Sequence, residues 1–357
     1  MRHIKKTILA VGVIAVAITL PAVAIDISGA GATFPYPIYA KWADAYKKET
    51  GNGLNYQSIG SGGGIKQISA KTVTFGASDM PLKAEQLEKD GLVQFPTVLG
   101  GVVPVINVEG IKPGDIVLDG AIIGDIFLGK IKSWDDAAIK KLNASAKLPA
   151  QPIVVVHRSD ASGTTEVFTD FLSKRSPVWV AALGAGRSVG KQIVWPVGLA
   201  GKGNDGVAGM LDQVDGAIGY LELSYVLSQG VPYGQVQNRA GAFVQPCPAT
   251  VRRASDGVTY PADLCVSLTD GRDPQAYPIT GTTYVLVDAD QPDRPTAAAL
   301  VGFLSWVLTT GQDLSAPLGY APLGERLQGL AAARLHAITV EGTALVAAPS
   351  ASPSRGG

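Results

Sequence analysis

In the first part of the chain, apolar residues at helical spacing alternate with short continuous apolar runs. Four of them recur at the spacing of one helix face: Ile38, Tyr39, Trp42 and Tyr46. They predict a helix over 38–48. Short apolar runs at 54–59 and 73–77 predict strands, and the glycine turn 60–64 leads into a predicted helix at 65–70. This order of strand, turn and helix indicates an α/β fold.

Two longer apolar runs predict strands that cross between two domains. The first is 95–108, with Gly100-Gly101 as the expected flexing point, and the second is 279–287. Between them the pattern predicts helices at 122–128, 134–142 and 207–214, a helix beginning at Ser162, and strands at 153–156 and 217–221. A further helix is expected at 296–308, whereas 238–275 are expected to be mostly loop.

The first 24 residues have the pattern of a secretory signal peptide. A positive region with Arg2, Lys5 and Lys6 precedes the apolar stretch 7–20, and Ala22-Val23-Ala24 fits a cleavage site. The alternative is an uncleaved membrane anchor, but about 14 apolar residues are short for a span of roughly 20. No cysteine follows the apolar stretch, so no lipid anchor is expected.

Charge and composition limit the classes of partner. The 24 cleaved residues carry three basic side chains and no acidic ones, which leaves 333 residues with 27 basic and 30 acidic side chains. This balance lacks a basic stripe and argues against nucleic acid as a partner. An anion would have to be bound by local dipoles and a few placed groups. Residues 346–357 are rich in Ala, Pro, Ser and Gly and are predicted to be disordered.

The two cysteines, Cys247 and Cys265, predict a disulfide in an exported protein. The bridge would close a loop of about 18 residues. A metal site is the alternative interpretation, but no histidine lies near the pair in the sequence, so no metal is expected.

The chain lacks the motifs of several enzyme classes. Gly29-Ala30-Gly31 begins like a dinucleotide fingerprint, but Phe34 replaces its third glycine and no buried strand is predicted before it. Gly60–Gly64 lacks the Gly-Lys-Ser/Thr ending of a P-loop. His157 and His336 have no nucleophile turn to serve. We therefore expect no enzyme activity and no cofactor.

Several scattered turns have the residues of an anion site. Thr33-Phe34, Ser61 and Ser162-Gly163-Thr164 each precede or open a predicted helix, where backbone N–H groups are unpaired and the helix dipole is positive. Arg158 adds a bidentate donor for an oxyanion. Each turn taken alone is more simply explained as a helix cap or a plain turn, and only their joint occurrence favours an anion site. Asp79 is the exception, because a carboxylate in an anion site must meet a proton.

These motifs resemble one known family. The segments that carry the resemblance, in order, are Gly29–Pro35, Ile59–Gly63, Phe75–Asp79, Ser162–Thr164 and Gly201–Gly206. They are similar to the periplasmic phosphate-binding protein of the bacterial high-affinity phosphate ABC transporter. The resemblance covers 27–220 and resumes around 277–287. It is weak between 231 and 273 and absent from the C-terminal tail.

The resemblance implies a binding site, a fold and partners. Phosphate would be held by eight residues: Thr33, Phe34, Ser61, Asp79, Arg158, Ser162, Gly163 and Thr164. Asp160 would orient Arg158. The implied fold is a two-domain periplasmic binding protein of type II, with 25–98 and 276–345 in domain I, 99–275 in domain II, two crossover strands as the hinge and the ligand in the cleft. The protein would be a periplasmic monomer that delivers phosphate to a membrane ABC permease.

Asp79 restricts the choice of ligand to an anion that carries a proton. An ionised Asp79 would repel sulfate, which has no proton at neutral pH, whereas phosphate can donate a P–OH to the carboxylate. Sites of this kind reject the unprotonated analogue by a factor on the order of 10⁴. Arsenate keeps the proton and is expected to bind. Two other functions stay open from the sequence: a phosphate-ester hydrolase, and a phosphate-binding module with a signalling or adhesive role.

Overall fold

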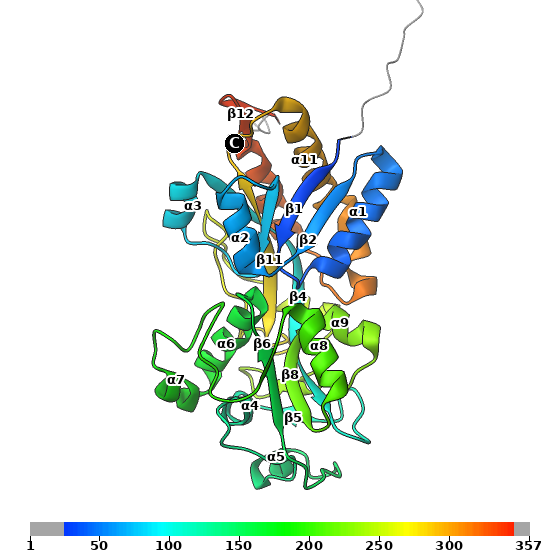
Figure 1. Cartoon of the computed structure of the whole chain (residues 1–357), viewed down its shortest axis with the longest axis vertical. Helices are drawn as coiled ribbons and strands as arrows, with labels where there is room; N and C mark the ends of the chain where they lie inside the picture. The colour runs from blue at the N-terminus through cyan, green and yellow to red at the C-terminus, as the bar shows by residue number, and fades with distance from the viewer. Residues whose placement is uncertain (1–24, 346–357) are drawn as a thin grey trace, which may run out of the picture.

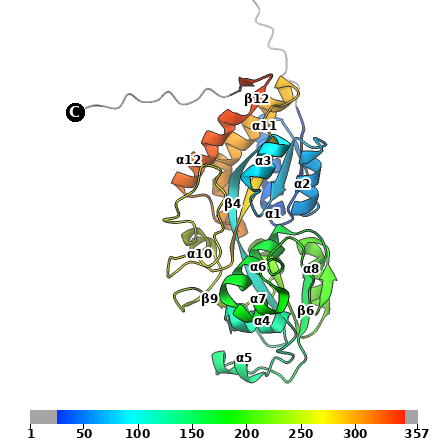
Figure 2. The same cartoon turned by 90° about the vertical axis from the view of Figure 1, so that its left-hand side faces the viewer.

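The computed structural model describes residues 25–345, which form an upper and a lower α/β half (Figure 1). The predicted signal peptide, 1–24, and the predicted disordered tail, 346–357, lie outside the described residues. The chain builds most of the upper half, passes down through the lower half, and returns to the upper half near its C-terminal end (Figure 2). Within 25–345 no helix has the length and apolar character to cross a membrane.

The upper half is a sheet with helices on its faces. Its strands are β1 (Ile27–Gly31), β2 (Leu54–Ser58), β3 (Phe75–Ser78), β11 (Thr280–Asp288) and the first part of β4 (Leu92–Asn107), and its helices include α1 (Tyr36–Thr50), α2 (Ser61–Ser69), α3 (Ala84–Asp90), α11 (Arg294–Val307) and α12 (Glu325–Arg334). The strand order is β2-β1-β3-β11-β4, in which β1 pairs parallel with β2 and β3. The α/β class expected from the sequence is therefore confirmed.

Helix α1 shows why the apolar spacing predicts this half. Its four buried residues are the predicted ones: Ile38, Tyr39, Trp42 and Tyr46. Tyr39 packs edge-on against Tyr56 of β2, with ring centroids 4.9 Å apart. Pro37 lies in the first turn, where a missing N–H costs nothing, and the helix ends at Gly51 with a positive φ of 81°.

Strand β1 was missed by the sequence analysis. Gly29 and Gly31 suggest a turn, yet both lie in a buried parallel strand. A side chain at Gly29 would place its Cβ 2.3 Å from the ring of Phe75, and one at Gly31 would lie 2.2 Å from the carbonyl oxygen of Ala77. The glycines are therefore required by the close packing of β1 against β3.

The lower half continues the same sheet in the order β4-β8-β6-β7. Its elements are α4 (Gly120–Phe127), α5 (Ala137–Leu142), β6 (Val154–Arg158), α6 (Gly163–Arg175), α7 (Pro177–Leu183), β7 (Leu199–Gly201), α8 (Gly203–Gln213), β8 (Ala217–Glu222) and α9 (Leu223–Gln229). A small sheet of β5 (Val117–Leu118), β9 (Gln235–Gln237) and β10 (Phe243–Val244) lies beside it. Helix α6 buries the predicted face: Val167, Phe168, Phe171 and Leu172.

Strand β4 connects the two halves. It pairs with β11 over Leu92–Gly101 and with β8 over Val102–Asn107, so the change of partner follows the Gly100-Gly101 pair. A Cβ at Gly100 would lie 2.5 Å from the ring of Phe34. Packing against Phe34 therefore requires this glycine, in addition to any role in bending.

The segment 238–275 contains only β10 and α10 (Pro248–Arg253) as regular elements, as expected from the sequence. It contacts both halves at the junction. Tyr284 of β11 donates a hydrogen bond to the Leu264 carbonyl (2.9 Å), and Lys174 of α6 donates one to the hydroxyl of Thr269 (2.7 Å). The segment therefore spans the two halves beside the β4 crossing.

The predicted disulfide is wrong for this structure, in which Cys247 and Cys265 are both free thiols. Cys247 lies at the start of α10, where its Sγ contacts the Thr250 hydroxyl at 3.5 Å. Cys265 is partly buried; burial and the nearby Asp263 raise the pKa of its thiol. The separation of two cysteines in the sequence does not determine whether their Cβ atoms lie within the short distance that a disulfide requires.

Candidate functional site

The predicted site residues meet where the two halves face each other. Strands β1, β3 and β6 end there, and α1, α2, α6 and α8 begin near these ends (Figure 1). The side chains of the eight-residue set are almost fully buried, each at most 4% exposed where a value applies: Thr33, Phe34, Ser61, Asp79, Arg158, Ser162 and Thr164. Gly163 is buried as well. The fold therefore assembles residues that the sequence separates widely.

Asp79 is a fully buried carboxylate at the end of β3. Its Oδ1 accepts a hydrogen bond from the Thr283 hydroxyl (3.0 Å), and its Oδ2 accepts one from the Ser61 hydroxyl (3.4 Å). Burial raises the pKa of Asp79 to about 7, although the hydrogen bond from Thr283 and the charge of Arg158 lower it. The sequence predicts an ionised carboxylate, whereas the structure places its titration near neutrality.

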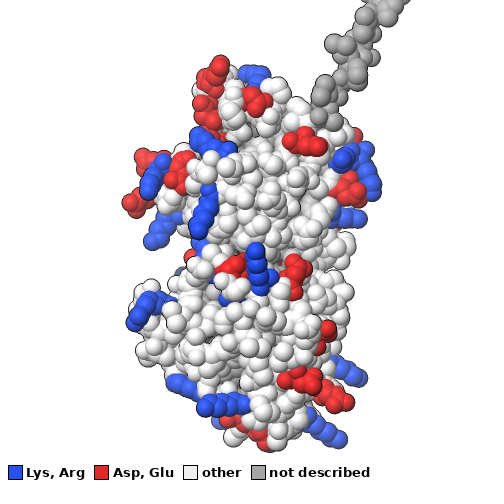
Figure 3. All heavy atoms as spheres, viewed as in Figure 1, with Lys and Arg blue, Asp and Glu red and all other residues white. Residues whose placement is uncertain are grey.

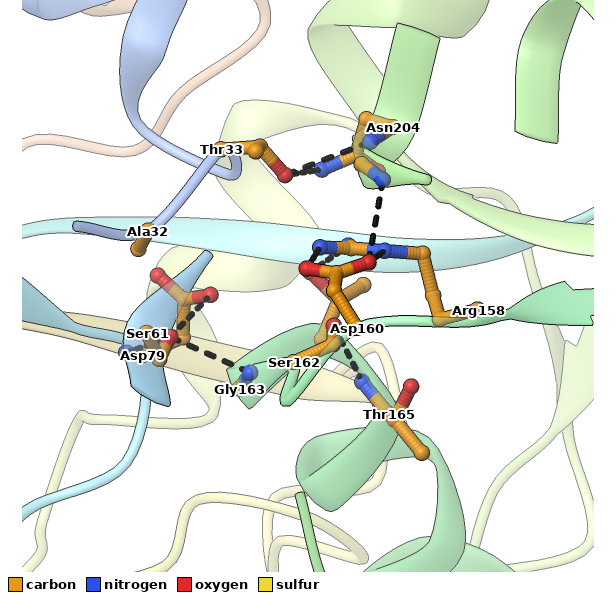
Figure 4. Close-up of polar contacts among 12 residues, drawn as sticks. Ala32, Thr33, Ser61, Asp79, Arg158, Asp160, Ser162, Gly163, Thr165 and Asn204 are labelled. Carbon is orange, nitrogen blue, oxygen red and sulfur yellow. Dashed lines mark hydrogen bonds and ion pairs between the residues drawn. The ribbon is translucent and has the colours of Figure 1, made fainter. Parts of the chain in front are cut away.

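Ser61 joins the two halves. The backbone N–H of Gly163, the first residue of α6, donates a hydrogen bond to Ser61 Oγ (3.1 Å). The backbone N–H of Gly62 donates one to the Ala161 carbonyl (2.9 Å). Figure 4 shows Ser61 and Asp79 facing Gly163 across the junction. The start of α2 and the start of α6 are thus in direct contact.

Glycine permits this close approach. A Cβ at Gly60 would lie 2.3 Å from Asp160 Oδ2, and a Cβ at Gly163 would lie 2.6 Å from Ser61 Oγ. Real Cβ atoms do not approach other atoms so closely, so a larger residue at either position would hold the halves apart.

Arg158 forms a bidentate ion pair with Asp160. Its Nε and Nη2 donate to the two carboxylate oxygens at 2.9 and 2.6 Å. Burial opposes the charge on Asp160, but the hydrogen bonds and charge of Arg158 lower its pKa. Asp160 also accepts a hydrogen bond from the N–H of Gly203 (3.0 Å), and Arg158 Nη1 donates to Thr164 Oγ1 (3.4 Å). These contacts fix the guanidinium at the start of α6.

Two hydroxyls of the site already act as acceptors. Thr33 Oγ1 accepts from the backbone N–H and the Nδ2 of Asn204, at 3.2 and 2.7 Å. Ser162 Oγ accepts from the N–H of Thr165 (3.1 Å) and caps α6. Because an accepting hydroxyl keeps its own proton, Thr33 and Ser162 can each donate one further hydrogen bond.

Two contributors to the site and one buried acid outside it were missed by the sequence analysis. Asn204 lies in the Gly201–Gly206 motif, which could have indicated it, since a polar residue directly after a glycine turn at a helix start is well placed to donate. Thr283 lies within an apolar strand and is far from Asp79 in the sequence, so no local pattern indicates it. Glu222, at the end of β8, is fully buried.

His157 is the histidine that comes directly before Arg158. His157 stacks on Trp195, with ring centroids 4.9 Å apart, and burial lowers its pKa. This packing supports a structural role. Among residues 25–345, no group of three or more His, Cys, Asp or Glu side chains is arranged to hold a metal ion.

The surface around the junction has no field of one sign. On the face drawn in Figure 3, basic and acidic side chains lie side by side at mid-height near the centre, and large areas above and below them have no charged side chains. This agrees with the near-zero formal net charge of the chain. Recognition of an anion must therefore come from the buried donors described above.

Comparison with known proteins identifies the family. A model of the PBP superfamily domain matches residues 17–310. The chain is 47% identical to the phosphate-binding protein PstS of Haemophilus influenzae over 85% of this chain and 91% of that protein. It is 45% identical to PstS of Pasteurella multocida, over 84% and 87% of the two chains.

A solved structure supports the fold. The phosphate-binding protein of Stenotrophomonas maltophilia superposes with a TM-score of 0.64 at 22% identity, over 88% of this chain and 94% of that one. Such structures confirm the predicted fold, a two-domain periplasmic binding protein. The curated relatives named above are binding proteins, which agrees with the expectation that this chain is not an enzyme. The chain belongs to the PBP superfamily and, within it, to the family of the PstS phosphate-binding proteins.

Proposed function

We propose that this protein captures inorganic phosphate outside the cytoplasmic membrane and delivers it to an ABC permease. The observation that carries the proposal is a buried junction at which hydrogen-bond donors from both halves surround one carboxylate, Asp79. The names of its relatives as phosphate-binding proteins support the choice of ligand. A binding protein of this family also implies a membrane permease as partner.

The residues proposed to bind phosphate are those that have a hydrogen-bond donor at the site. Thr33 and Ser162 would donate their free hydroxyl protons, and Ser61 and Thr164 would donate through hydroxyl or backbone groups. Phe34 and Gly163 would donate backbone N–H groups. Gly163 now donates to Ser61, so phosphate would take over a donor that already points into the junction. Arg158, oriented by Asp160, would bind the phosphate oxygens.

Asp79 would accept the proton of phosphate. Because burial raises its pKa to about 7, the carboxylate binds a proton strongly near neutral pH and is well matched to a P–OH donor. Sulfate brings no proton, so above pH 7 it would face an ionised acceptor at short range. Below pH 7 Asp79 would carry its own proton, and the rejection of sulfate should weaken. Arsenate keeps its proton and would bind as well.

We further propose that the halves act as hinged domains. Domain I would comprise 25–98 and 276–345, and domain II 99–275, with β4 and β11 as the crossover strands. The mature protein would begin after residue 24 and act as a periplasmic monomer. The contacts of Gly62 and Gly163 across the junction would then form on closure.

Calorimetry on the purified mature protein tests the proposal. Phosphate should bind with micromolar or tighter affinity, about −8 kcal/mol or more favourable. The absence of measurable binding would refute the proposed function. A p-nitrophenyl phosphate assay with added divalent metals tests the hydrolase alternative, and clear turnover would favour that alternative.

A further inference from the structure

Glu222 is a buried acid that the proposed site does not use. It is the last residue of β8, pairs with Val102 of β4 where that strand crosses between the halves, and is 0% exposed. Its Oε1 is buried and has no hydrogen-bond partner. No ion pair among residues 25–345 includes it. An ionised carboxylate with no ion-pair partner and one unsatisfied oxygen would be strongly destabilising at such a position.

The other carboxylate oxygen begins a row of hydroxyl contacts. Glu222 Oε2 accepts from the N–H of Ser224 (2.8 Å) and also contacts Ser224 Oγ. Ser224 Oγ lies 2.8 Å from the Tyr320 hydroxyl, and the Tyr320 hydroxyl donates to the Phe34 carbonyl at 2.6 Å. The row passes from α9 in the lower half to the upper half.

The number of protons in this row determines the state of Glu222. The Phe34 carbonyl can only accept, so the single hydroxyl proton of Tyr320 must point to it. The contact between Ser224 and Tyr320 then needs the hydroxyl proton of Ser224. No proton is left for the contact between Ser224 and Glu222 unless the carboxyl group supplies it. Three contacts need three protons, and the two hydroxyls have only two.

We propose that Glu222 is a neutral positioning residue whose carboxyl proton completes a hydroxyl relay, through Ser224 and Tyr320, to the carbonyl of Phe34. Burial also raises the pKa of Glu222 to about 8, which agrees with the proton count. The titratable groups that act on it are Asp79, Tyr225 and Tyr320. Both tyrosines have pKa values raised by burial and are neutral, so Asp79 is the only charge of the three.

The relay ends on the turn that binds the anion in the proposed function, on which this step rests. The Tyr225 hydroxyl donates to the Thr33 carbonyl (2.6 Å), and Tyr320 holds the next carbonyl, that of Phe34. Together they would fix the Thr33–Phe34 peptide, whose N–H is proposed to bind phosphate. Glu222 would thereby couple the strand crossing to the geometry of the ligand turn.

Two matched variants separate the relay from simple burial. Tyr320→Phe removes a hydroxyl that lowers the pKa of Glu222, but it also frees the hydroxyl proton of Ser224 to bond to the carboxylate. The Ser224 hydroxyl has the larger lowering effect of the two, so the pKa of Glu222 should fall, by roughly one pH unit. Tyr225→Phe removes a hydroxyl that is also buried but lies outside the relay, and should leave the titration of Glu222 unchanged. Tyr320→Phe should also weaken phosphate binding about tenfold, since it leaves the Phe34 carbonyl without its partner.

The measurement is carbon-13 NMR of the glutamate carboxyl carbons in the phosphate-saturated and phosphate-free protein, with Glu222→Gln used only to assign the signal. The relay predicts a wild-type midpoint near 8 and a lower midpoint in Tyr320→Phe. A wild-type midpoint near 4.5, a rise in Tyr320→Phe, or an equal fall in Tyr225→Phe would overturn it. If the predicted titrations are found but phosphate does not bind, the relay stands and the proposed function fails.

Discussion

Replacing Asp79 with asparagine should stabilise the phosphate-free protein at alkaline pH. The wild-type carboxyl group is fully buried, and its pKa rises from 3.8 to about 7. The folded protein therefore favours the protonated form. The stability that this group contributes is complete below pH 3.8 and is lost as the pH rises to about 7. The asparagine of the variant would be neutral at every pH, so the variant would not lose this stability.

The size of this change in unfolding free energy follows from the shift in the pKa of Asp79. At 1.36 kcal/mol per pKa unit, a shift from 3.8 to about 7 corresponds to roughly 4 kcal/mol above pH 7. Somewhat less than half of this penalty, roughly 2 kcal/mol, is already present at pH 5. The gain in unfolding free energy of Asp79→Asn over the wild type should thus increase by about 2–3 kcal/mol between pH 5 and pH 8.

Urea unfolding at both pH values, without phosphate, measures this gain. Asp212→Asn removes an exposed carboxylate of α8 and is the matched control, for which no such increase is expected. If Asp79→Asn gained no more at pH 8 than at pH 5, the carboxyl group would be hydrated in the phosphate-free protein. The argument from burial would then be wrong.

Two further variants test the contact between the halves. Gly163→Ala should weaken phosphate binding at least tenfold, because its Cβ would lie 2.6 Å from Ser61 Oγ and hold the halves apart; unchanged affinity by calorimetry would contradict this, and Gly209→Ala, where a Cβ meets nothing within 4 Å, is the control. Asn204→Ala removes the Nδ2 donor to Thr33 Oγ1 but keeps the backbone N–H donor, and should cost about 0.5–1.5 kcal/mol of phosphate binding; an unaltered dissociation constant would remove the Asn204 side chain from the site.

Local patterns were sufficient for several helices, such as α1 and α6, and for the turns of the proposed site, whereas α3, α7, α9 and α12 were not predicted. The spacing of Ile38, Tyr39 and Trp42 determines which face of α1 is buried, because that face repeats at the helical period. The site turns were recognisable because a serine or threonine beside glycine at a helix start serves both as a cap and as an anion donor.

Features that depend on pairing across the fold could not be predicted. Thr283 reaches Asp79 only because β11 lies beside β3. No local sequence pattern in the run 279–287 indicates that Thr283 contacts a carboxylate. Strand β1 looks like a turn because its glycines serve packing against β3. The disulfide was inferred from the number of cysteines and from the expected export of the protein, and neither determines the distance between the two cysteine side chains.

The ratio of phosphate affinity to sulfate affinity, measured by calorimetry at pH 6 and pH 8, tests the central claim most directly. At pH 8 Asp79 is ionised, and the ratio should be on the order of 10⁴. At pH 6 Asp79 carries a proton that it can donate to sulfate, so the ratio should be smaller. Asp79→Asn should lower the pH 8 ratio more than Thr33→Ala does. A ratio near one at pH 8, or one that Asp79→Asn leaves unchanged, would contradict the account.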